Sequence, residues 1–265
     1  MNIAILIPAR FASSRYPGKP LVELRGSTGI TKPLIQRSFE AAPRVANVSS
    51  TFVVTDDQRI ASASERFGAP VIMTSSHCRN GTERCAEALS DLGPADVVVN
   101  LQGDALLTPP HFVQALIDHL AADKAAQVVT PAIRLRSTEV RSLQQEEALG
   151  RVGGTTVVTD TRGRALYFSK RLIPHLPANA LDLPLSPVRL HIGVYAYRPE
   201  ALKAYVRTPV ADLETLEGLE QLRFLSAGVP VDVVEVDPPR FALRELNNPE
   251  DVEPIEQALA DAGLE

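Results

Sequence analysis

The sequence predicts an α/β fold with a mixed, mainly parallel sheet flanked by helices. Two observations lead to this prediction. From the N-terminus to Leu101, short apolar runs with the length of buried strands alternate with helix-forming stretches. Beyond Val128, strand-like runs follow one another without clear helices between them, which is typical of a mixed or antiparallel extension of the sheet.

The first half of the chain contains four predicted strands, at residues 3–7, 50–54, 70–73 and 96–101. The polar residues Thr55-Asp56-Asp57 close the second strand and can cap a helix from about Gln58 to Phe67, which Gly68 stops. A second helix is expected over residues 82–92. Strands that alternate with helices in this way pair in parallel through right-handed crossovers.

The second half has a different pattern. Further strands are predicted at residues 128–133, 156–159 and 165–168, followed by a proline-rich loop at 174–187 that is expected to lie over the site. A leucine-rich helix at 213–227, a strand at 231–236 and a closing helix at 249–262 complete the chain. Because no repeat or linker interrupts it, we expect one domain over residues 1–265, with an embedded smaller lobe at about 170–225.

The composition restricts the class of protein. A net charge of −5 argues against broad binding to nucleic acids or membrane surfaces, which requires a basic face. No apolar run approaches the roughly 20 residues that span a bilayer, and the N-terminus enters a strand without a signal sequence, so a cytoplasmic protein is expected. Cys78 and Cys85 lack the spacing of a zinc site and are expected to be free.

The loop after the first strand is the strongest functional signal. It reads Arg10-Phe11-Ala12-Ser13-Ser14-Arg15-Tyr16-Pro17-Gly18-Lys19 and carries three cations, two hydroxyls and a glycine. The carboxyl end of a first strand is where open α/β folds hold phosphorylated ligands. Fixed cations and backbone N–H groups there can neutralise several phosphate oxygens. The loop therefore predicts a phosphate site, with a solvated basic turn as the alternative.

A second polar segment, Asn100-Leu101-Gln102-Gly103-Asp104, ends the strand at 96–101. Gly103 lets the backbone approach a ligand closely, and Asp104 can hold a hard cation. The alternative is that Asp104 only caps the helix that starts near Pro109. Phosphate-binding cations and a carboxylate on adjacent strand ends together indicate Mg²⁺-assisted transfer of a nucleotidyl group.

Two further segments carry candidate residues. In His191-Ile192-Gly193-Val194-Tyr195, an alternating strand would place His191 and Tyr195 on one polar face. That face lines a cavity or faces solvent, so His191 is either a ligand-binding or a structural histidine. On the leucine-rich helix, Glu214, Glu217 and Glu220 are expected to form a solvated face. The alternative is that Glu220 and Gln221 face a polar ligand.

Taken together, four segments resemble the 3-deoxy-manno-octulosonate cytidylyltransferases, also called CMP-KDO synthetases: residues 7–21, 100–104, 165–169 and 219–223. The segments Val54-Thr55-Asp56-Asp57 and Gly81-Thr82-Glu83-Arg84 match the family as well. The resemblance runs through nearly the whole chain in the right order. It implies a nucleotide-diphospho-sugar transferase fold, usually in a homodimer.

The resemblance also implies an activity. Enzymes of this family use Mg²⁺ to join CMP from CTP to an eight-carbon keto-sugar acid and release pyrophosphate, a step of lipopolysaccharide biosynthesis. The residues expected to bind CTP are Ala9, Arg10, Ser13, Lys19, Gln102 and Gly103. The residues expected to act in catalysis are Arg10, Arg15, Lys19 and Asp104. The residues expected to bind the sugar acid are Lys170, His191, Tyr195, Glu220 and Gln221. The expected metal ligands are Asp104 and Asn247.

This sequence departs from the family at several of these positions. Asn247 stands where the family has a second metal-binding aspartate, Thr156 where it has a lysine, and Lys170 where it has an arginine. The segment 26–31 is longer than the usual turn, and Asp104 is followed by Ala105-Leu106 instead of Glu-Pro.

Because most of these changes fall at metal and acceptor positions, nucleotide binding is expected to persist while the acceptor can differ. One alternative is the same fold acting on another acidic or phosphonate acceptor or on another nucleotide. The other alternative is a non-catalytic nucleotide-binding regulatory protein.

Overall fold

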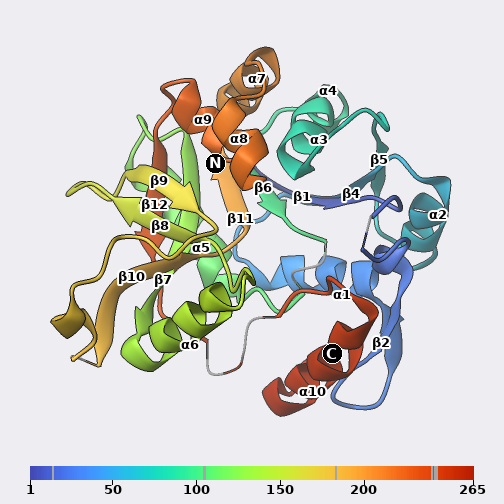
Figure 1. Cartoon of the computed structure of the whole chain (residues 1–265). Coiled ribbons are helices and arrows are strands. Elements are labelled where there is room, and N and C mark those ends of the chain that lie inside the picture. The colour runs from blue at the N-terminus through green and yellow to red at the C-terminus, as the bar shows by residue number, and fades with distance from the viewer. Residues whose placement is uncertain (14, 104–105, 183, 240, 242–243) are drawn as a thin grey trace. The chain divides into compact units, whose positions relative to one another are not determined.

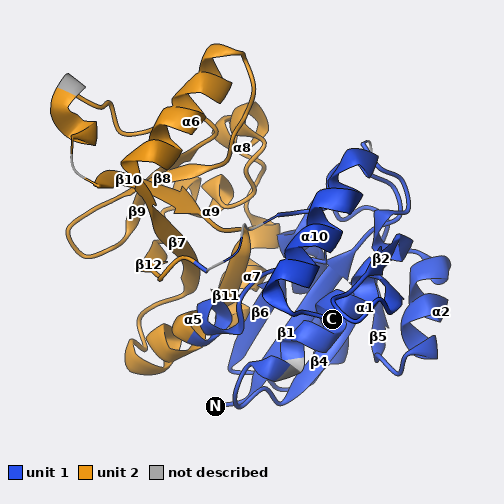
Figure 2. Cartoon of the chain, turned by 90° about the horizontal axis from the view of Figure 1, so that it is seen from below, with its two compact units in different colours: residues 1–114, 239–265 blue, residues 115–238 orange. Residues whose placement is uncertain are grey.

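The computed structural model describes residues 1–13, 15–103, 106–182, 184–239, 241 and 244–265. The chain divides into two compact units, residues 1–114 with 239–265 and residues 115–238, coloured separately in Figure 2. The boundary falls within α5 (Pro110–Ala122). The predicted lobe at about 170–225 lies within the second unit, and the prediction of a single domain stays a prediction.

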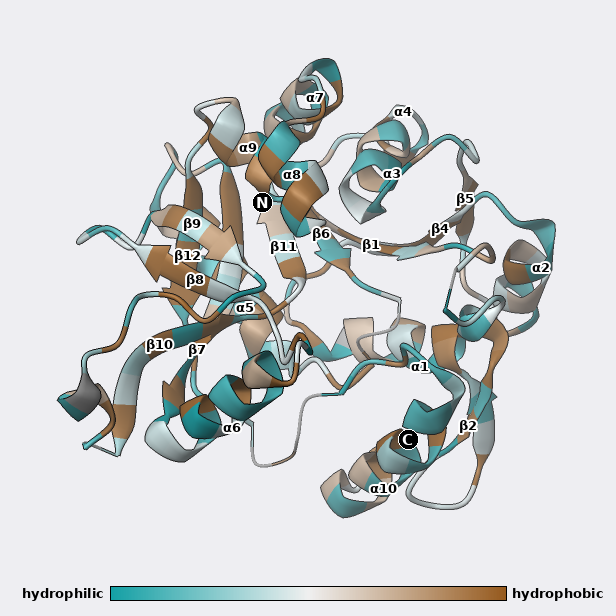
Figure 3. Ribbon diagram, viewed as in Figure 1, coloured by the Kyte–Doolittle hydropathy of each residue, from teal (hydrophilic) through white to brown (hydrophobic). Residues whose placement is uncertain are grey.

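The first unit is built on four parallel strands in the order β5-β4-β1-β6. They are β1 (Ile3–Ala9), β4 (Ser50–Thr55), β5 (Val71–Met73) and β6 (Val97–Leu101). Every residue of β1 and β6 is buried, as expected for apolar runs covered on both faces. Figure 3 shows mainly hydrophobic colouring along β1. All four strand predictions in this half are confirmed.

Helices cover both faces of this sheet, with α3 on one side and α1 on the other (Figure 1). They are α1 (Leu34–Ala41), α2 (Gln58–Arg66), α3 (Gly81–Glu87) and α4 (Leu89–Leu92), with short 3-10 turns at Lys19–Leu21 and Ala42–Arg44. Asp57 caps α2 as predicted. The helix expected over 82–92 is instead two, because the backbone tightens at Ala88, where ψ is −14°.

The longer segment at 26–31 has a clear place in the fold. It connects β2 (Glu23–Arg25) and β3 (Thr31–Pro33) in an antiparallel hairpin. The chain closes with a 3-10 turn at Pro249–Asp251 and α10 (Val252–Ala262), and Glu256 of α10 forms an ion pair with Arg25 at 3.1 Å. Leu24 packs in one core cluster with Leu246, Ile255 and Leu259. The hairpin and the C-terminal segment therefore stabilise each other.

The second unit contains a mixed sheet in the order β11-β7-β10-β8-β9, with β12 beside β7. The strands are β7 (Val128–Arg136), β8 (Thr156–Thr159), β9 (Ala165–Ser169), β10 (Leu185–His191), β11 (Val194–Tyr197) and β12 (Val231–Glu235). The β7–β12 pair is parallel, and the other pairs within this unit are antiparallel. The predicted change of pattern after Val128 is confirmed.

Two predictions about helices in this unit are wrong. A helix, α6 (Ser137–Ala148), lies between β7 and β8, where none was expected. Its residues are largely polar and few are buried, so it lacks the apolar stripe that marks a helix in a sequence. The helix expected over 213–227 is broken into α8 (Asp212–Glu217) and α9 (Leu222–Ser226), because Gly218 takes a left-handed conformation with φ +60°.

Two remaining elements are α7 (Pro199–Arg207) and a 3-10 turn at Ala178–Leu181, which lies within the expected loop 174–187. Among the described residues, no helix combines the length and the apolar character needed to cross a membrane.

Candidate functional site

The cationic loop that follows β1 folds back on Phe11. The carbonyl oxygen of Phe11 accepts hydrogen bonds from the backbone N–H groups of Ser13 and Gly18, both at 2.9 Å. Gly18 has φ +74°, and a Cβ placed on it would lie 2.9 Å from Cε2 of the Phe11 ring. Glycine is therefore required here both for the backbone conformation and for the close approach of the ring.

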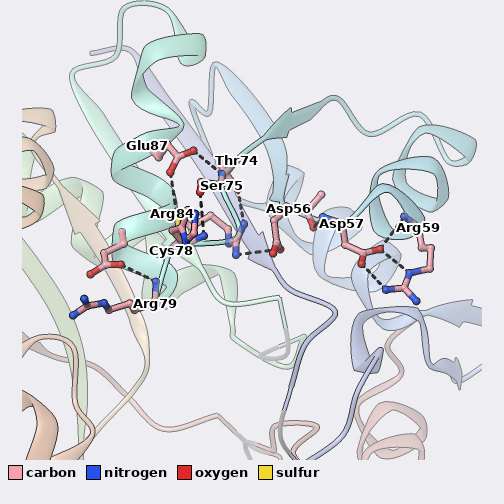
Figure 4. Close-up of polar contacts among 12 residues, drawn as sticks. Asp56, Asp57, Arg59, Thr74, Ser75, Cys78, Arg79, Arg84 and Glu87 are labelled. Carbon is pink, nitrogen blue, oxygen red and sulfur yellow. Dashed lines mark hydrogen bonds and ion pairs between the residues drawn. The ribbon is translucent and has the colours of Figure 1, made fainter.

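The Phe11 ring is also covered by α2. The guanidinium carbon of Arg59 lies 3.3 Å from the ring centroid, a cation–π contact. Asp57 holds this guanidinium by accepting from Nε at 2.9 Å and from Nη2 at 2.6 Å (Figure 4). These bonds place the pKa of Asp57 below its ordinary value. Asp57, which also caps α2, thus connects the helix to the loop.

The loop is tied to the segment before α10. Nη2 of Arg15 donates to Oδ1 of Asn247 at 2.7 Å, and Nζ of Lys19 donates to the carbonyl of Leu246 at 3.1 Å. The carboxylate of Asp251 accepts the backbone N–H groups of Asn247 and Asn248 and fixes this segment. The structure therefore brings Arg15 and Lys19 to the segment that contains Asn247, and the side chain of Asn247, a predicted metal ligand, contacts a cation of the loop.

Gly103 also requires the absence of a side chain. A Cβ on Gly103 would lie 2.9 Å from the carbonyl oxygen of Pro8, and the Gly103 carbonyl accepts from Oγ of Ser38 at 2.9 Å. Gln102 is close to the start of α3, since its Nε2 lies 3.1 Å from the Cβ position of Gly81. The predicted nucleoside residues thus lie at the end of β6, beside the end of β1. Asp104, the predicted metal ligand, lies outside the described residues.

Asn100 is a residue whose importance the sequence reasoning missed. Its side chain is fully buried in β6, and within the described part of the chain neither its amide nitrogen nor its amide oxygen has a hydrogen-bond partner. Leaving a buried polar group unpaired costs about 1–3 kcal/mol, so such groups mark functional or strained positions. Its Nδ2 lies 3.2 Å from the Cβ position of Gly81, next to Gln102. The sequence did offer a signal for this position, since Asn100 is the one polar residue in the apolar strand β6.

An ion pair joins residues 54–57 to residues 81–84, two of the segments that resemble the family. Arg84 of α3 contacts the Asp56 carboxylate at 3.1 Å and also donates to Thr74 (Figure 4). Nearby, Sγ of Cys78 donates to Glu87 at 3.1 Å, and burial together with this carboxylate raises the thiol pKa to about 12. Neither Cys78 nor Cys85 forms a disulfide, as predicted. Among the described residues no cluster of three or more His, Cys, Asp or Glu side chains could hold a metal ion.

In the second unit, His191 is a buried neutral histidine. Its Nε2 lies 2.9 Å from Oγ1 of Thr130, which also lies 2.9 Å from the Val194 carbonyl. Because the hydroxyl has one hydrogen to give to the carbonyl, we assign the Nε2–H tautomer, which donates to Thr130. Burial lowers the pKa of His191 to about 3.

The alternating strand predicted over 191–195 is wrong as a single strand. The strand β10 ends at His191 and β11 begins at Val194, because the chain turns at Ile192-Gly193, where the Val194 N–H donates to the Ile192 carbonyl. The rings of His191 and Tyr195 nevertheless lie 5.5 Å apart. The two predicted acceptor residues are therefore neighbours, although not through strand alternation.

The solvated glutamate face predicted for the leucine-rich helix is also wrong. Glu214 is buried and accepts from Nε and Nη2 of Arg223 at 2.7 and 2.6 Å. Glu217 accepts hydrogen bonds from the residues that end β9. The break at Gly218 is the physical reason, since it turns α9 so that Arg223 reaches back to α8. Glu220 is partly buried, and its carbonyl accepts from the Tyr205 hydroxyl.

Gln221 and Lys170 complete the predicted acceptor residues. Gln221 is 2% exposed, and its Nε2 has no hydrogen-bond partner among the residues that the structure describes, so a buried donor is left unpaired there. Lys170 is exposed just after β9, and its Nζ lies 2.9 Å from the Cβ position of Gly218. Thr156 is buried and donates to the carbonyl of Arg171 at 2.6 Å.

The predicted residues divide between the two units. The phosphate, nucleoside and metal positions that the structure describes belong to the first unit: Ala9, Arg10, Ser13, Arg15, Lys19, Gln102, Gly103 and Asn247. The acceptor positions belong to the second: Lys170, His191, Tyr195, Glu220 and Gln221. The role of each residue stays a prediction.

Comparisons with known proteins identify the family. A family model described as cytidylyltransferase matches residues 4–234. The 3-deoxy-manno-octulosonate cytidylyltransferase of Maricaulis maris is 38% identical over 266 residues, which cover 99% of this chain and 99% of the relative. The mitochondrial 3-deoxy-manno-octulosonate cytidylyltransferase of Arabidopsis thaliana is 40% identical over 260 residues, 98% of this chain and 83% of the relative.

A solved structure agrees with these relatives. It is a CMP:2-keto-3-deoxy-manno-octonic acid synthetase complexed with CTP, with 34% identity, a TM-score of 0.84 and coverage of 99% of this chain and 100% of that one. This match confirms the predicted nucleotidyltransferase fold. Because the similarity to both relatives extends over nearly the whole of this chain, the chain belongs to the 3-deoxy-manno-octulosonate cytidylyltransferase family of nucleotidyltransferases.

Proposed function

We propose that this protein joins CMP from CTP to 3-deoxy-manno-octulosonate or a closely related keto-sugar acid and releases pyrophosphate. Full-length similarity to relatives that carry the name of this activity supports the proposal. The cationic loop adds support, since Arg15 and Lys19 are held by the segment at 246–247 and Phe11 is held by Arg59. A braced loop can present its cations to a triphosphate at little further cost in side-chain order.

In the proposed reaction, a hydroxyl oxygen of the acceptor bonds to the α-phosphorus of CTP. The bond from that phosphorus to the oxygen bridging it to the β-phosphorus breaks, pyrophosphate leaves, and the hydroxyl proton passes to solvent. Arg10, Arg15 and Lys19 stabilise the negative charge that builds up on the phosphate oxygens. Guanidinium groups suit this role because they form two parallel hydrogen bonds to one phosphate.

The acceptor is proposed to lie against Lys170, His191, Tyr195, Glu220 and Gln221. The ammonium of Lys170 would attract the carboxylate of the acid, and the unpaired Nε2 of Gln221 would donate to one of its oxygens. With a pKa of about 3, His191 is uncharged at neutral pH and too weak to remove the hydroxyl proton. It therefore contributes shape and hydrogen bonding, not general-base catalysis.

Magnesium is part of the proposal, with Asp104 as its protein ligand. Mg²⁺ usually takes only one or two protein carboxylates beside substrate phosphates, so one aspartate fits. Asn247 fits less well, because its amide oxygen already accepts from the Arg15 guanidinium. We assign Asn247 to holding Arg15. When bound, the ion would offset negative charge on the triphosphate.

An assay of pyrophosphate release tests this function. The protein is supplied with CTP, Mg²⁺ and one acceptor at a time, from a panel of octulosonate, other keto-sugar acids and phosphonates. The expected result is turnover with octulosonate or another eight-carbon acid, and much weaker turnover with UTP or GTP. Turnover that requires a phosphonate or another nucleotide would move the protein to the corresponding alternative. CTP binding without pyrophosphate release, under Mg²⁺ or Mn²⁺, would identify a non-catalytic regulatory protein.

We also propose a cytoplasmic homodimer that supplies an activated sugar acid for lipopolysaccharide biosynthesis. The side chains of Leu213 and Leu216 on α8 are 45% and 82% exposed, which is unusual for leucine and favours a partner surface. Figure 3 shows hydrophobic colouring on α8. Sedimentation equilibrium of the wild type and of Leu216→Glu tests this assembly, with dissociation expected for the variant and a monomeric wild type contradicting it.

A further inference from the structure

We propose that Glu217 is a positioning residue that sets the place of Lys170, the predicted cation for the acceptor carboxylate. Glu217 is the last residue of α8, and Lys170 follows directly after β9. Because Lys170 binds an acceptor only under the proposed function, this inference depends on that function.

The carboxylate of Glu217 accepts hydrogen bonds from three groups at the end of β9. Oε1 of Glu217 accepts from Oγ of Ser169 at 2.7 Å and from the hydroxyl of Tyr167 at 3.3 Å. Oε2 accepts from the backbone N–H of Lys170 at 2.9 Å. Oγ of Ser169 in turn accepts from the backbone N–H of Arg171 at 3.0 Å. Two consecutive peptide groups after β9 are therefore fixed by Glu217, one directly and one through Ser169.

The residue after Glu217 leaves space for the lysine side chain. Gly218 has φ +60°, and a Cβ placed on it would lie 2.9 Å from Nζ of Lys170. A side chain at this position would both strain the backbone and displace the ammonium. At the end of α8, Glu217 thus holds the backbone of Lys170, and Gly218 leaves space for the Lys170 ammonium.

The neighbouring cation is directed elsewhere. Nη1 of Arg171 donates to Glu147 of α6 at 3.1 Å, and its carbonyl accepts from Thr156. Lys170 is therefore the cation whose ammonium lies beside Gly218, the residue that follows α8 and precedes Gln221 by three positions in the sequence. This arrangement assigns the predicted contact with an acidic acceptor to Lys170.

A carboxylate is needed for this task. Burial by itself would raise the pKa of Glu217, but the hydrogen bonds from Lys170, Ser169 and Tyr167 outweigh it, and the pKa lies below its ordinary value. The charged form accepts all three hydrogen bonds. An amide has no charge, so Glu217→Gln replaces the charge-assisted hydrogen bonds from Ser169, Tyr167 and Lys170 by weaker neutral ones, whichever way the amide is turned.

Steady-state kinetics of four proteins test the inference: wild type, Glu217→Gln, Lys170→Ala and the double variant. We expect Glu217→Gln to raise the acceptor KM about tenfold, because its hydrogen bonds to the segment after β9 are no longer charge-assisted, and to leave the CTP KM unchanged. If Glu217 acts through Lys170, the double variant has the acceptor KM of Lys170→Ala alone. Effects that multiply would overturn the inference, as would an equal rise of both KM values.

A matched control is Glu200→Gln on α7, where the carboxylate pairs with Lys203 at 2.7 Å on the surface of the same unit. It is expected to leave both KM values unchanged. Should Glu217→Gln fail to fold, Ser169→Ala removes the link to Arg171 and one Glu217 contact, and its acceptor KM is expected to rise by about threefold to tenfold.

Hydrogen–deuterium exchange gives a second readout that needs no turnover. In Glu217→Gln, the peptide covering residues 169–173 is expected to exchange faster, while a peptide within β7 keeps the wild-type rate. An unchanged rate at 169–173 would refute the positioning role. If residues 169–173 exchange faster in Glu217→Gln but the wild type transfers no CMP to any sugar acid, the positioning role stands and the proposed function is refuted. The two failures are therefore distinguishable.

Discussion

The Arg15 guanidinium donates a 2.7 Å hydrogen bond to the amide oxygen of Asn247, a residue 232 positions away in the sequence. The resemblance to the family leads one to expect a metal ligand at Asn247, yet in this structure the side chain holds a cation of the cationic loop. Lys19 donates to the adjacent Leu246 carbonyl, so the same segment supports two of the three cations. The neutral amide supports Arg15 without competing with phosphate for its charge.

Replacing Asn247 by alanine is therefore expected to raise the CTP KM about threefold to tenfold, because Arg15 loses its anchor and must be ordered on binding. The acceptor KM is expected to stay unchanged. Asn179→Ala, at an exposed asparagine of the other unit, is the control for steady-state kinetics. An Asn247→Ala protein with the wild-type CTP KM would show that the contact has no role in nucleotide binding.

The contact between Arg59 and Phe11 predicts a smaller effect of the same kind. A cation–π contact at an exposed site contributes about 0.5–1 kcal/mol, so Arg59→Ala is expected to raise the CTP KM by about twofold to fivefold. Arg66→Ala, at the exposed end of the same helix, removes an equal charge without touching the loop and should change nothing. If both variants raise the CTP KM equally, the loss of a positive charge is responsible and the ring contact is not.

Gly103→Ala is expected to lower stability by about 1–3 kcal/mol, because the new methyl group would press on the Pro8 carbonyl at 2.9 Å. Gly193→Ala is the matched control, since nothing lies within 4 Å of a Cβ there and its backbone is not left-handed. Urea unfolding of both variants measures the difference. Equal midpoints for the two proteins would mean that the strands separate easily at this point.

His191 predicts a pH dependence of stability. The folded protein holds its pKa at about 3, below the ordinary value of 6.5, so this group stabilises the fold above pH 6.5 and that stability is lost as the pH falls. Between pH 7.5 and 5.5 the loss is expected to be about 1 kcal/mol. His191→Gln, which cannot titrate, should lack this part of the slope in urea unfolding. Identical slopes for both proteins would mean that the pKa of His191 is not lowered in the folded state.

Much of the fold could be predicted because the first unit follows simple patterns. The strands β1 and β6 are short apolar runs, and Asp57 caps α2 from a position that a sequence reveals. The helix α6 could not be predicted in this way, because its residues are mostly polar. The three-residue spacing of leucines at 213–222 was misleading, since Leu216 is 82% exposed and Gly218 breaks the helix.

Residue types predicted the cationic loop, and the resemblance to the family predicted the acceptor positions, while the role of each residue stays a prediction. The connections between these residues could not be predicted. Hydrogen bonds such as Arg15–Asn247 or Glu217–Ser169 join positions far apart, and no periodicity in a single sequence records them. The amide of Asn100, which has no partner among the described residues, was equally hidden, because hydrogen-bond pairing is a property of the folded interior.

Asp57 performs two tasks with one carboxylate, since it caps the first turn of α2 and grips the guanidinium that covers Phe11. Fraying of that turn and loosening of the loop are therefore one event. Warming the protein should weaken its hold on the nucleotide before the sheet begins to melt, so that the earliest thermal damage is to affinity.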